Sequence, residues 1–443
     1  MARSLPFLLV ILLVACNNLE DATIPERNTF IRFFGNVMSY SSVVAERDTD
    51  GGFIIAGNVA PMTIEGDAKD PRNFPGIIII KTSDQGTKVW EKIYRHANVQ
   101  AIKPLTDGYL VTGQGIDLNP GSSESSEFVN TQFLLMKLGS TGDSVSGFKM
   151  DSTITVLRGT ETVTLRVDFK AYASVVNGGE IETVGSYKVP SGQERTITMG
   201  FSPSDLSVPV WRKNLDLQNS DYVNTNFVAL SNGNLIWSST AAPIDANQSK
   251  YLSVIAVPPN YASPSNNGLF GKGDESGGHE VHDMQPSATG FGAIGTFTNK
   301  SGGKNVFFVK IDPVGNVIDT AYFDCGSTDE SLIKVQNDAR AVQSVSQDDG
   351  SAVVYTKDSG FVLACSMGQT PEKGNGGTDI VLIKIDAFGN YRWSKLLGGS
   401  GNEVATSIRE LPDGTLLIAG TSTISNISSL FIIRADANGE LRE

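Results

Sequence analysis

The sequence predicts an all-β fold, a single β-propeller for which we expect seven four-stranded blades. Three observations lead to this prediction: a repeated pattern of apolar segments and tight turns, a glycine-rich composition, and an N-terminal segment able to complete the last repeat. Of 443 residues, 46 are glycine, and only 19% are charged. This composition favours many short strands joined by tight turns over long helices. Length alone would suggest roughly three domains, but propellers grow by repetition within one domain.

The repeat is clearest at the C-terminus. An alternating segment at 403–408 precedes the turn Asp413-Gly414, and an apolar segment at 416–420 follows it. A second apolar segment at 430–434 leads into another turn that ends in Gly439. The Asp side chain caps backbone N–H groups of such a turn, and Gly supplies the positive φ that closes it. Each unit therefore contains four strands, a to d, and must stack on its neighbours to bury both faces.

Seven such units are counted along the chain. They span residues 42–95, 98–150, 167–215, 222–272, 279–324, 340–397 and 402–443. The third and fourth units are degenerate and are recognised mainly by Trp211 and Trp237. Six or eight blades are alternatives, because residues 151–167 have the pattern of an added hairpin and residues 332–345 that of a short helix between blades.

The last unit lacks a proper fourth strand. Residues 29–35 resemble the fourth strand of the preceding unit, at 391–398. We therefore expect the N-terminal strand to complete the last blade and close the ring. Closure removes the exposed edges of an open array, which favours a propeller over a solenoid.

The N-terminus predicts export and a lipid anchor. Arg3 precedes an apolar run from Leu5 to Val14, which is too short to span a bilayer comfortably. The end of this run, Leu13-Val14-Ala15-Cys16, resembles the lipobox of bacterial lipoproteins. That resemblance implies cleavage before Cys16 and acylation of this cysteine. An ordinary secretory signal with an incidental Cys16, or an uncleaved anchor, is the alternative.

These features divide the chain into three parts. We expect a signal peptide at 1–15, a lipidated tether at 16–28 and the propeller at 29–443. The protein is then lipid-anchored at the bacterial cell envelope, on the outer membrane. It faces either the periplasm or the outside.

Two longer motifs carry a family resemblance. The segments DGGFIIAG…IIIIKTSDQGTKVWEK and LIKIDAFGNYRWSK are similar to repeats of uncharacterised secreted and lipid-anchored bacterial propeller proteins. The resemblance implies the fold and transfers no catalytic residue. The Trp after the hairpin also resembles the tryptophan-docking element of quinoprotein propellers. Only Trp90, Trp211 and Trp393 stand at that place, and no vicinal cysteine pair is present, which argues against quinone binding.

The net charge argues against one class of partner, and the cysteine content bears on disulfide bonds and zinc sites. The net charge is −13 and the pI is about 4.8, so nucleic acid is not an expected partner, because phosphate binding needs a basic patch. We expect Cys325 and Cys365 to be small buried residues within strands, although a disulfide between them is possible in an exported protein. The sequence contains no CxxC pair, so a zinc site is not expected.

The candidate binding face is the one with long loops. In an up-and-down blade the a–b and c–d turns share one face, and the b–c and d–a connections share the other, where function is expected. The loops predicted on that second face carry acidic residues: Asp67, Asp70, Asp117, Glu124, Glu127 and Asp379. Clustered carboxylates can bind calcium, the only cofactor suggested by this pattern. A solvated acidic rim is the alternative explanation.

Other candidate residues favour structural roles. His279 and His282 lack the HExxH spacing and point to opposite faces of a strand. Glu280, Glu330 and Glu403 each follow a Gly-rich turn, which suggests hydrogen bonds between blades.

Neither a Gly-x-Ser-x-Gly elbow nor a phosphate-binding loop is evident. We therefore predict no catalytic residue and expect a binding or scaffold protein for a protein or glycan partner. The alternatives are a glycan-active hydrolase or lyase with an acidic site at the channel mouth, and a cofactor-binding redox propeller.

Overall fold

A computed structural model describes most of the chain from Thr29 onward. The described residues are 29–35, 39–60, 74–118, 128–150, 153–158, 161–188, 194–215, 220–229, 235–243, 249–257, 265–272, 277–325, 334–335, 347–368 and 376–441. In these ranges every regular element is a β-strand. They contain no helix long and apolar enough to cross a membrane. Cys16 and the predicted signal peptide lie outside them.

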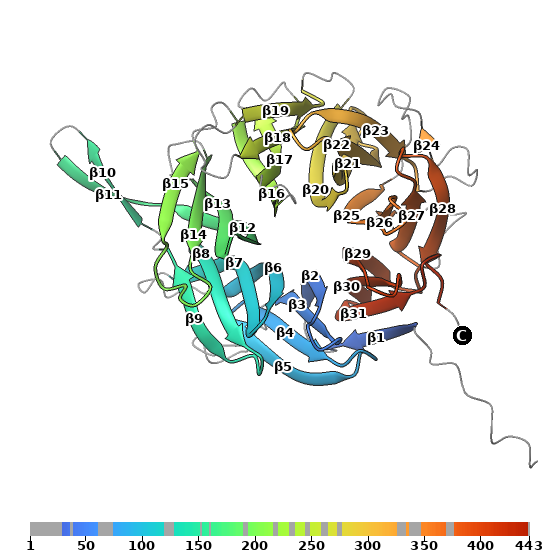
Figure 1. Cartoon of the computed structure of the whole chain (residues 1–443), viewed down its shortest axis with the longest axis horizontal. Helices are drawn as coiled ribbons and strands as arrows, with labels where there is room; N and C mark the ends of the chain where they lie inside the picture. The colour runs from blue at the N-terminus through green and yellow to red at the C-terminus, as the bar shows by residue number, and fades with distance from the viewer. Residues whose placement is uncertain are drawn as a thin grey trace, which may run out of the picture.

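Seven four-stranded antiparallel blades stand in a ring around one axis, as predicted (Figure 1). Blades one to three comprise β2 (Tyr40–Arg47), β3 (Phe53–Val59), β4 (Gly76–Thr82) and β5 (Lys88–Arg95); β6 (Ala97–Leu105), β7 (Gly108–Leu118), β8 (Phe128–Gly139) and β9 (Ser144–Lys149); and β12 (Asp168–Asn177), β13 (Glu180–Lys188), β14 (Glu194–Phe201) and β15 (Trp211–Leu215). In each blade the first strand is innermost and the last forms the rim (Figure 1).

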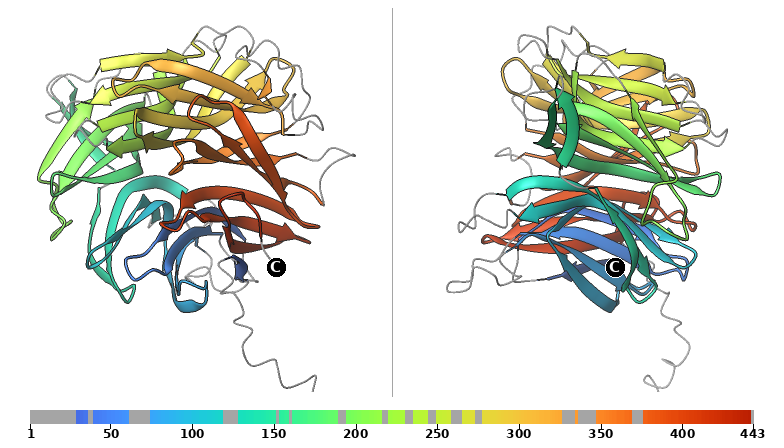
Figure 2. Two further views of the ribbon diagram at one scale, coloured as in Figure 1. Left: turned by 45° about the vertical axis from the view of Figure 1, so that its right-hand side comes forward. Right: turned by 90° about the vertical axis from the view of Figure 1, so that its left-hand side faces the viewer.

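The other four blades follow the same order around the ring. They comprise β16 (Ser220–Ala229), β17 (Leu235–Pro243), β18 (Tyr251–Val257) and β19 (Ser265–Phe270); β20 (Gly277–Ser287), β21 (Gly290–Asn299), β22 (Lys304–Ile311) and β23 (Val317–Phe323); β25 (Asp349–Tyr355), β26 (Phe361–Met367), β27 (Asp379–Ile385) and β28 (Tyr391–Leu397); and β29 (Asn402–Glu410), β30 (Leu416–Ile424) and β31 (Ile427–Ala435). Seen from the side, neighbouring sheets pack face to face (Figure 2).

Two insertions depart from this regular order. The predicted hairpin is confirmed as β10 (Thr153–Arg158) and β11 (Glu161–Arg166), a separate two-stranded sheet that projects outward from the ring (Figure 1). The short helix expected at 332–345 is not seen in its described part. There, β24 (Lys334–Val335) adds a fifth strand to blade five, and blade six begins at Asp349 rather than near residue 340.

The N-terminal strand closes the ring, as predicted. β1 (Phe30–Phe34) pairs antiparallel with β31, from Phe30 opposite Arg434 to Phe34 opposite Leu430. This strand supplies the fourth strand of blade seven. The ring is thus closed by hydrogen bonds between the two ends of the propeller sequence.

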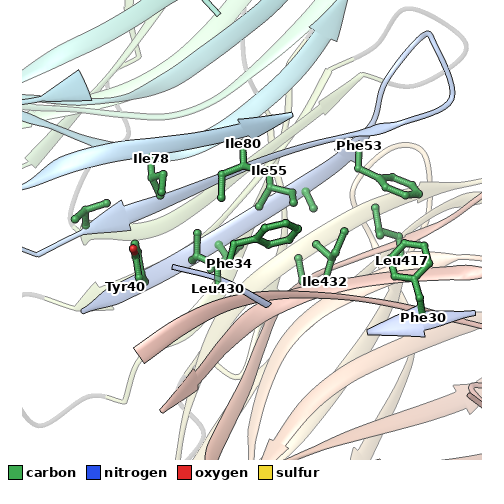
Figure 3. Close-up of a cluster of buried hydrophobic side chains, with 14 of the residues drawn as sticks. Phe30, Phe34, Tyr40, Phe53, Ile55, Ile78, Ile80, Leu417, Leu430 and Ile432 are labelled. Atoms are coloured by element: carbon green, nitrogen blue, oxygen red, sulfur yellow. The ribbon is translucent and has the colours of Figure 1, made fainter. Parts of the chain in front are cut away.

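The core lies between the blades. Between blades seven and one, Phe30 and Phe34 pack with Phe53, Ile80 and Leu430 (Figure 3). Every residue of β4 is buried, which explains its almost continuous apolar run. Strands buried on both faces need a partner sheet on each side, and a closed ring provides one for every blade.

Candidate functional site

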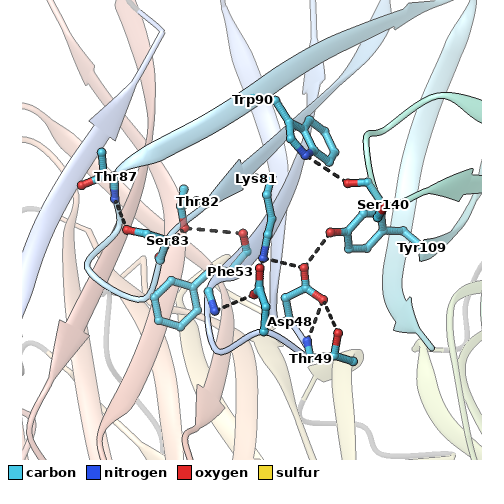
Figure 4. A network of polar contacts seen from close by, with 12 residues as sticks. Asp48, Thr49, Phe53, Lys81, Thr82, Ser83, Thr87, Trp90, Tyr109 and Ser140 are labelled. Carbon is cyan, nitrogen blue, oxygen red and sulfur yellow. Dashed lines mark hydrogen bonds and ion pairs between the residues drawn. The ribbon is translucent and has the colours of Figure 1, made fainter. Parts of the chain in front are cut away.

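A buried lysine joins the third strand of blade one to its first turn (Figure 4). Lys81 Nζ lies 2.5 Å from Asp48 Oδ2 and 2.6 Å from Asp50 Oδ1, and the Lys81 side chain is 6% exposed. The Tyr109 hydroxyl of blade two donates to Asp48 Oδ2 at 2.6 Å. Burial raises the pKa of Asp48, but hydrogen bonds from Lys81 and Tyr109 outweigh it, so this pKa lies below its usual range.

The same ion pair recurs in other blades. Its members are Lys137–Asp107 at 2.7 Å, Lys384–Asp358 at 2.6 Å and Arg434–Asp413. In blade five, Lys310 instead donates to the carbonyl of Ala387 in blade six, at 2.8 Å. In blades one, two, six and seven, the basic residue near the end of the apolar run therefore holds the first turn of its blade in place. Sequence reasoning missed this role, although the signal was the recurrence of Lys or Arg after the apolar run and of Asp in the turn.

A tryptophan clamp joins neighbouring blades at the rim. We use this name for Trp90 and Lys92 of β5 acting on Gly142 and Asp143 of the next blade. The indole N–H of Trp90 donates to the carbonyl of Ser140 at 3.2 Å, and Lys92 pairs with Asp143 at 2.5 Å. Gly142 has φ +79°, and a Cβ there would lie 2.8 Å from the indole ring. Only glycine fits both conditions.

A second clamp joins blades six and seven. Trp393 covers Gly439, and Lys395 pairs with Glu440 at 2.8 Å. Trp211 differs, because it packs on Gly200 of its own blade and its indole N–H donates to Glu180 at 2.9 Å. The tryptophan motif thus docks one blade on the next at two of its three sites.

Ring closure uses a related contact. Phe30 and Arg32 of β1 lie against Gly86 in the third turn of blade one, where φ is +74°. A Cβ at Gly86 would lie 2.7 Å from the Phe30 ring and 2.8 Å from the Arg32 side chain. The N-terminal strand therefore docks on blade one as the clamps do elsewhere.

Charged side chains from four blades meet near the centre of the ring. We call Glu46, Lys103, Asp283 and Arg409 the inner charged cluster; they lie on the innermost strands β2, β6, β20 and β29. Arg409 donates from Nε to Glu46 Oε1 at 2.8 Å, and its Nη2 forms an ion pair with the same oxygen at 2.7 Å. The two side chains are 27% and 23% exposed, so water reaches this pair despite the surrounding protein.

Three members of the inner charged cluster, Lys103, Asp283 and Arg409, have shifted pKa values. Burial lowers the pKa of Lys103, and Glu46 opposes this shift. Burial also acts to lower the pKa of Arg409, but Glu46 outweighs it and the pKa is raised. For Asp283 burial dominates and raises the pKa, against the opposing charge of Arg409.

Asp283 also carries hydrogen bonds that tie blades together. Its Oδ2 accepts from the backbone N–H of Val353 in blade six at 3.0 Å, and its Oδ1 accepts from the N–H of Met284 at 2.8 Å. A carboxylate used in this way is a structural acceptor. Among the described residues, no group of three or more His, Cys, Asp and Glu side chains is placed to hold a metal ion.

Every innermost strand carries a bulge at the equivalent place. The register shifts fall at Ser41/Val44, Val99/Ala101, Ala171/Ala173, Val223/Asn226, Val281/Asp283, Gly350/Ala352 and Ala405/Ser407. A bulge re-aims side chains and breaks the ladder locally. In blade five it separates the two histidines: His279 Nε2 lies 2.8 Å from the Tyr322 hydroxyl, whereas His282 Nδ1 lies 3.7 Å from Asp349. The two histidines thus contact different groups.

The acidic residues predicted for the binding face fall in different places. Asp67, Asp70, Glu124 and Glu127 lie outside the described residues, and Asp117 lies in β7, where only the backbone is described. The predicted loop position of Asp379 is wrong. This residue begins β27 and is fully buried, against Gly398 of the following connection. The acidic loop site and its calcium stay predictions.

Two of the glutamates predicted to bond to the next blade have polar partners elsewhere: those of Glu403 lie in its own blade and the connection before it, and that of Glu280 lies in the preceding blade. Glu403 accepts from the N–H of Gly399 at 2.8 Å and from the hydroxyl of Ser422 at 2.7 Å. Glu280 pairs with Lys250 of the preceding blade. Glu330 lies outside the described residues.

Comparisons with known proteins give distant likenesses. No family model matches the chain, and no curated protein matches its sequence. A protein of unknown function from Dyadobacter fermentans has 12% identity and a TM-score of 0.48, over 91% of this chain and 99% of that chain. Trypanosoma rangeli sialidase has 10% identity and a TM-score of 0.43, over 91% of this chain and 54% of that one. These likenesses carry no information on activity, and the propeller is established by its own strand pairing.

Proposed function

We propose that this protein is a lipoprotein of the bacterial cell envelope that binds a protein or glycan partner without catalysing a reaction. One observation carries the non-catalytic part of this proposal: in the inner charged cluster, Glu46 and Arg409 are paired with each other, and Asp283 accepts from a backbone N–H of the next blade. Charges used to join blades are poorly suited to exchange protons with a substrate.

The proposed anchor is Cys16. Residues 17–28 separate this cysteine from Thr29, and the next residue begins the strand that closes the ring. An acylated Cys16 would therefore attach the propeller to the membrane at blade seven. The test is fractionation of cells that express the wild-type chain or Cys16→Ser: we expect Cys16→Ser to leave the membrane fraction, and unchanged membrane retention would contradict the proposal.

The proposed binding face is the one with the b–c and d–a connections. Asp67 and Asp70 lie in the connection between β3 and β4, and Glu124 and Glu127 in that between β7 and β8. Acidic side chains on two adjacent loops suit a partner with basic groups or a hydroxyl-rich glycan. The matched control is provided by Asp84 and Asp205, exposed acids in turns of the opposite face.

Affinity capture from solubilised envelopes tests this assignment. We expect Asp67→Asn/Asp70→Asn to lose a partner that the wild type retains, and Asp84→Asn/Asp205→Asn to keep it. Equal capture by both variants would contradict the proposed face. Cleavage of envelope glycans by the purified protein would instead support the hydrolase alternative and overturn the non-catalytic role.

A further inference from the structure

Two buried cysteines lie on opposite sides of one blade junction. Cys325 follows β23 of blade five, and Cys365 lies within β26 of blade six. Both are free thiols, 7% and 0% exposed, and both belong to one apolar cluster that includes Phe308 and Phe361. Their side chains therefore share a dry environment at the interface between two blades.

Each cysteine is held by its own element. The N–H of Cys325 donates to Asp348 Oδ2 at 2.8 Å, which fixes the chain just beyond the rim strand of blade five. Cys365 pairs with Val381 of β27 and with Gly350 of β25, so its backbone is fixed on both sides. The two side chains belong to the same buried cluster, and the Cys325 thiol is affected by the Cys365 thiol as a hydrogen-bond partner. That contact, followed by burial, raises the pKa of the Cys325 thiol well above its usual range.

We infer that Cys325 and Cys365 are a preorganised pair that becomes a disulfide bond between blades five and six when the chain folds in an oxidising compartment. This inference goes beyond the proposed function. It concerns the junction at which residues 324–348 separate β23 of blade five from β25 of blade six. A covalent link there restricts the unfolded chain, which is how a disulfide stabilises a fold.

The chemistry is thiol–disulfide exchange with a disulfide oxidant such as oxidised glutathione. One cysteine thiolate attacks the oxidant, forms a mixed disulfide and releases one glutathione thiol. The second cysteine thiolate attacks the protein sulfur of that mixed disulfide and releases the second glutathione. Two protons leave the cysteines, which are oxidised as the glutathione disulfide is reduced. Burial and the raised pKa make the folded dithiol a poor nucleophile, so we assign the exchange to folding.

The test uses the full chain with Cys16→Ser, which leaves Cys325 and Cys365 as the only thiols. The protein is unfolded under reducing conditions and refolded with or without oxidised glutathione. Denatured samples are then treated with a polyethylene-glycol maleimide, and the intact mass is measured. After oxidative refolding we expect no maleimide shift and a mass lower by two hydrogen atoms.

Stability provides a second measurement. We expect reduction to lower the folding equilibrium constant of oxidised protein by about 100-fold, and to leave Cys16→Ser/Cys325→Ala/Cys365→Ala unchanged. Native-like protein that keeps two alkylatable thiols after oxidative refolding would overturn the inference. Because purified protein without Cys16 is used, that result would leave the membrane anchor proposal untouched.

Discussion

The guanidinium of Arg409 in blade seven contacts the Glu46 carboxylate of blade one through two nitrogens, Nε at 2.8 Å and Nη2 at 2.7 Å, beside the junction closed by the N-terminal strand. We predict that Glu46→Gln lowers the free energy of unfolding by about 2 kcal/mol, because the partly buried Arg409 guanidinium loses the charged carboxylate that it contacts. The measurement is urea denaturation. Adding Arg409→Met to Glu46→Gln should remove most of this loss of stability, because the double variant has no guanidinium left without its carboxylate. Strictly additive effects of the two substitutions would show that the pair is not coupled.

The buried ion pair of blade one gives a prediction with an internal control. Lys81→Met removes the partner of Asp48 and should lower the free energy of unfolding by about 3 kcal/mol. Lys88 pairs with Glu91 in the same blade, but its side chain is 53% exposed, so Lys88→Met should change stability by less than about 0.5 kcal/mol. Equal effects of the two substitutions would contradict the structural role of Lys81.

Acid should weaken the fold through the same carboxylates. The pKa values of Asp48 and Asp358 lie below their usual range, so these groups stay ionised in the folded protein after their unfolded counterparts bind protons. Their stabilisation is fully present above the unfolded pKa of about 3.9 and is lost as pH falls through the lower folded pKa. Denaturation curves between about pH 6 and pH 3 test this prediction. Lys81→Met/Lys384→Met should show a shallower decline, and a parallel decline would contradict the assignment.

The tryptophan clamp predicts a difference between two glycines. Gly142 and Gly414 both have positive φ, of +79° and +85°, but only at Gly142 would a Cβ meet a neighbouring ring. Both alanine variants should lose about 1 kcal/mol to backbone strain, and Gly142→Ala should lose at least about 1 kcal/mol more through overlap with Trp90. Chemical denaturation measures both losses. If Gly414→Ala were less stable than Gly142→Ala, the clamp would be excluded.

Two phenylalanines on the closing strand provide another matched pair. Phe30 is 8% exposed and Phe33 is 61% exposed. Phe30→Ala should lower the free energy of unfolding by about 3 kcal/mol, whereas Phe33→Ala should change it by less than about 0.5 kcal/mol. Thermal or chemical denaturation of the two variants checks this. Similar small effects would mean that β1 adds little to ring stability.

The architecture was predictable because it repeats. Turns such as Asp413-Gly414 mark the strand ends, and the likeness of residues 29–35 to 391–398 revealed the closing strand. The error at Asp379 arose at a strand boundary, because the loop before it ends one residue earlier than the Gly and Ser content suggested.

The inner charged cluster was beyond reach for a different reason. Glu46, Lys103, Asp283 and Arg409 are far apart in sequence and share neither residue type nor motif. Only the closed ring brings them together. The tryptophan clamps could be predicted only in part. The tryptophan motif was visible in the sequence, but its contact with the next blade depends on how the blades pack.

The seam between β1 and β31 has a mechanical consequence. Five residue pairs join these strands antiparallel, and Phe30 and Arg32 also grip the adjacent blade at Gly86. Tension applied along β1 from the segment that precedes it would load all these contacts in shear, together rather than one after another. A force applied at the proposed tether would therefore have to break the pairing of β1 with β31 as a unit before the blades could separate.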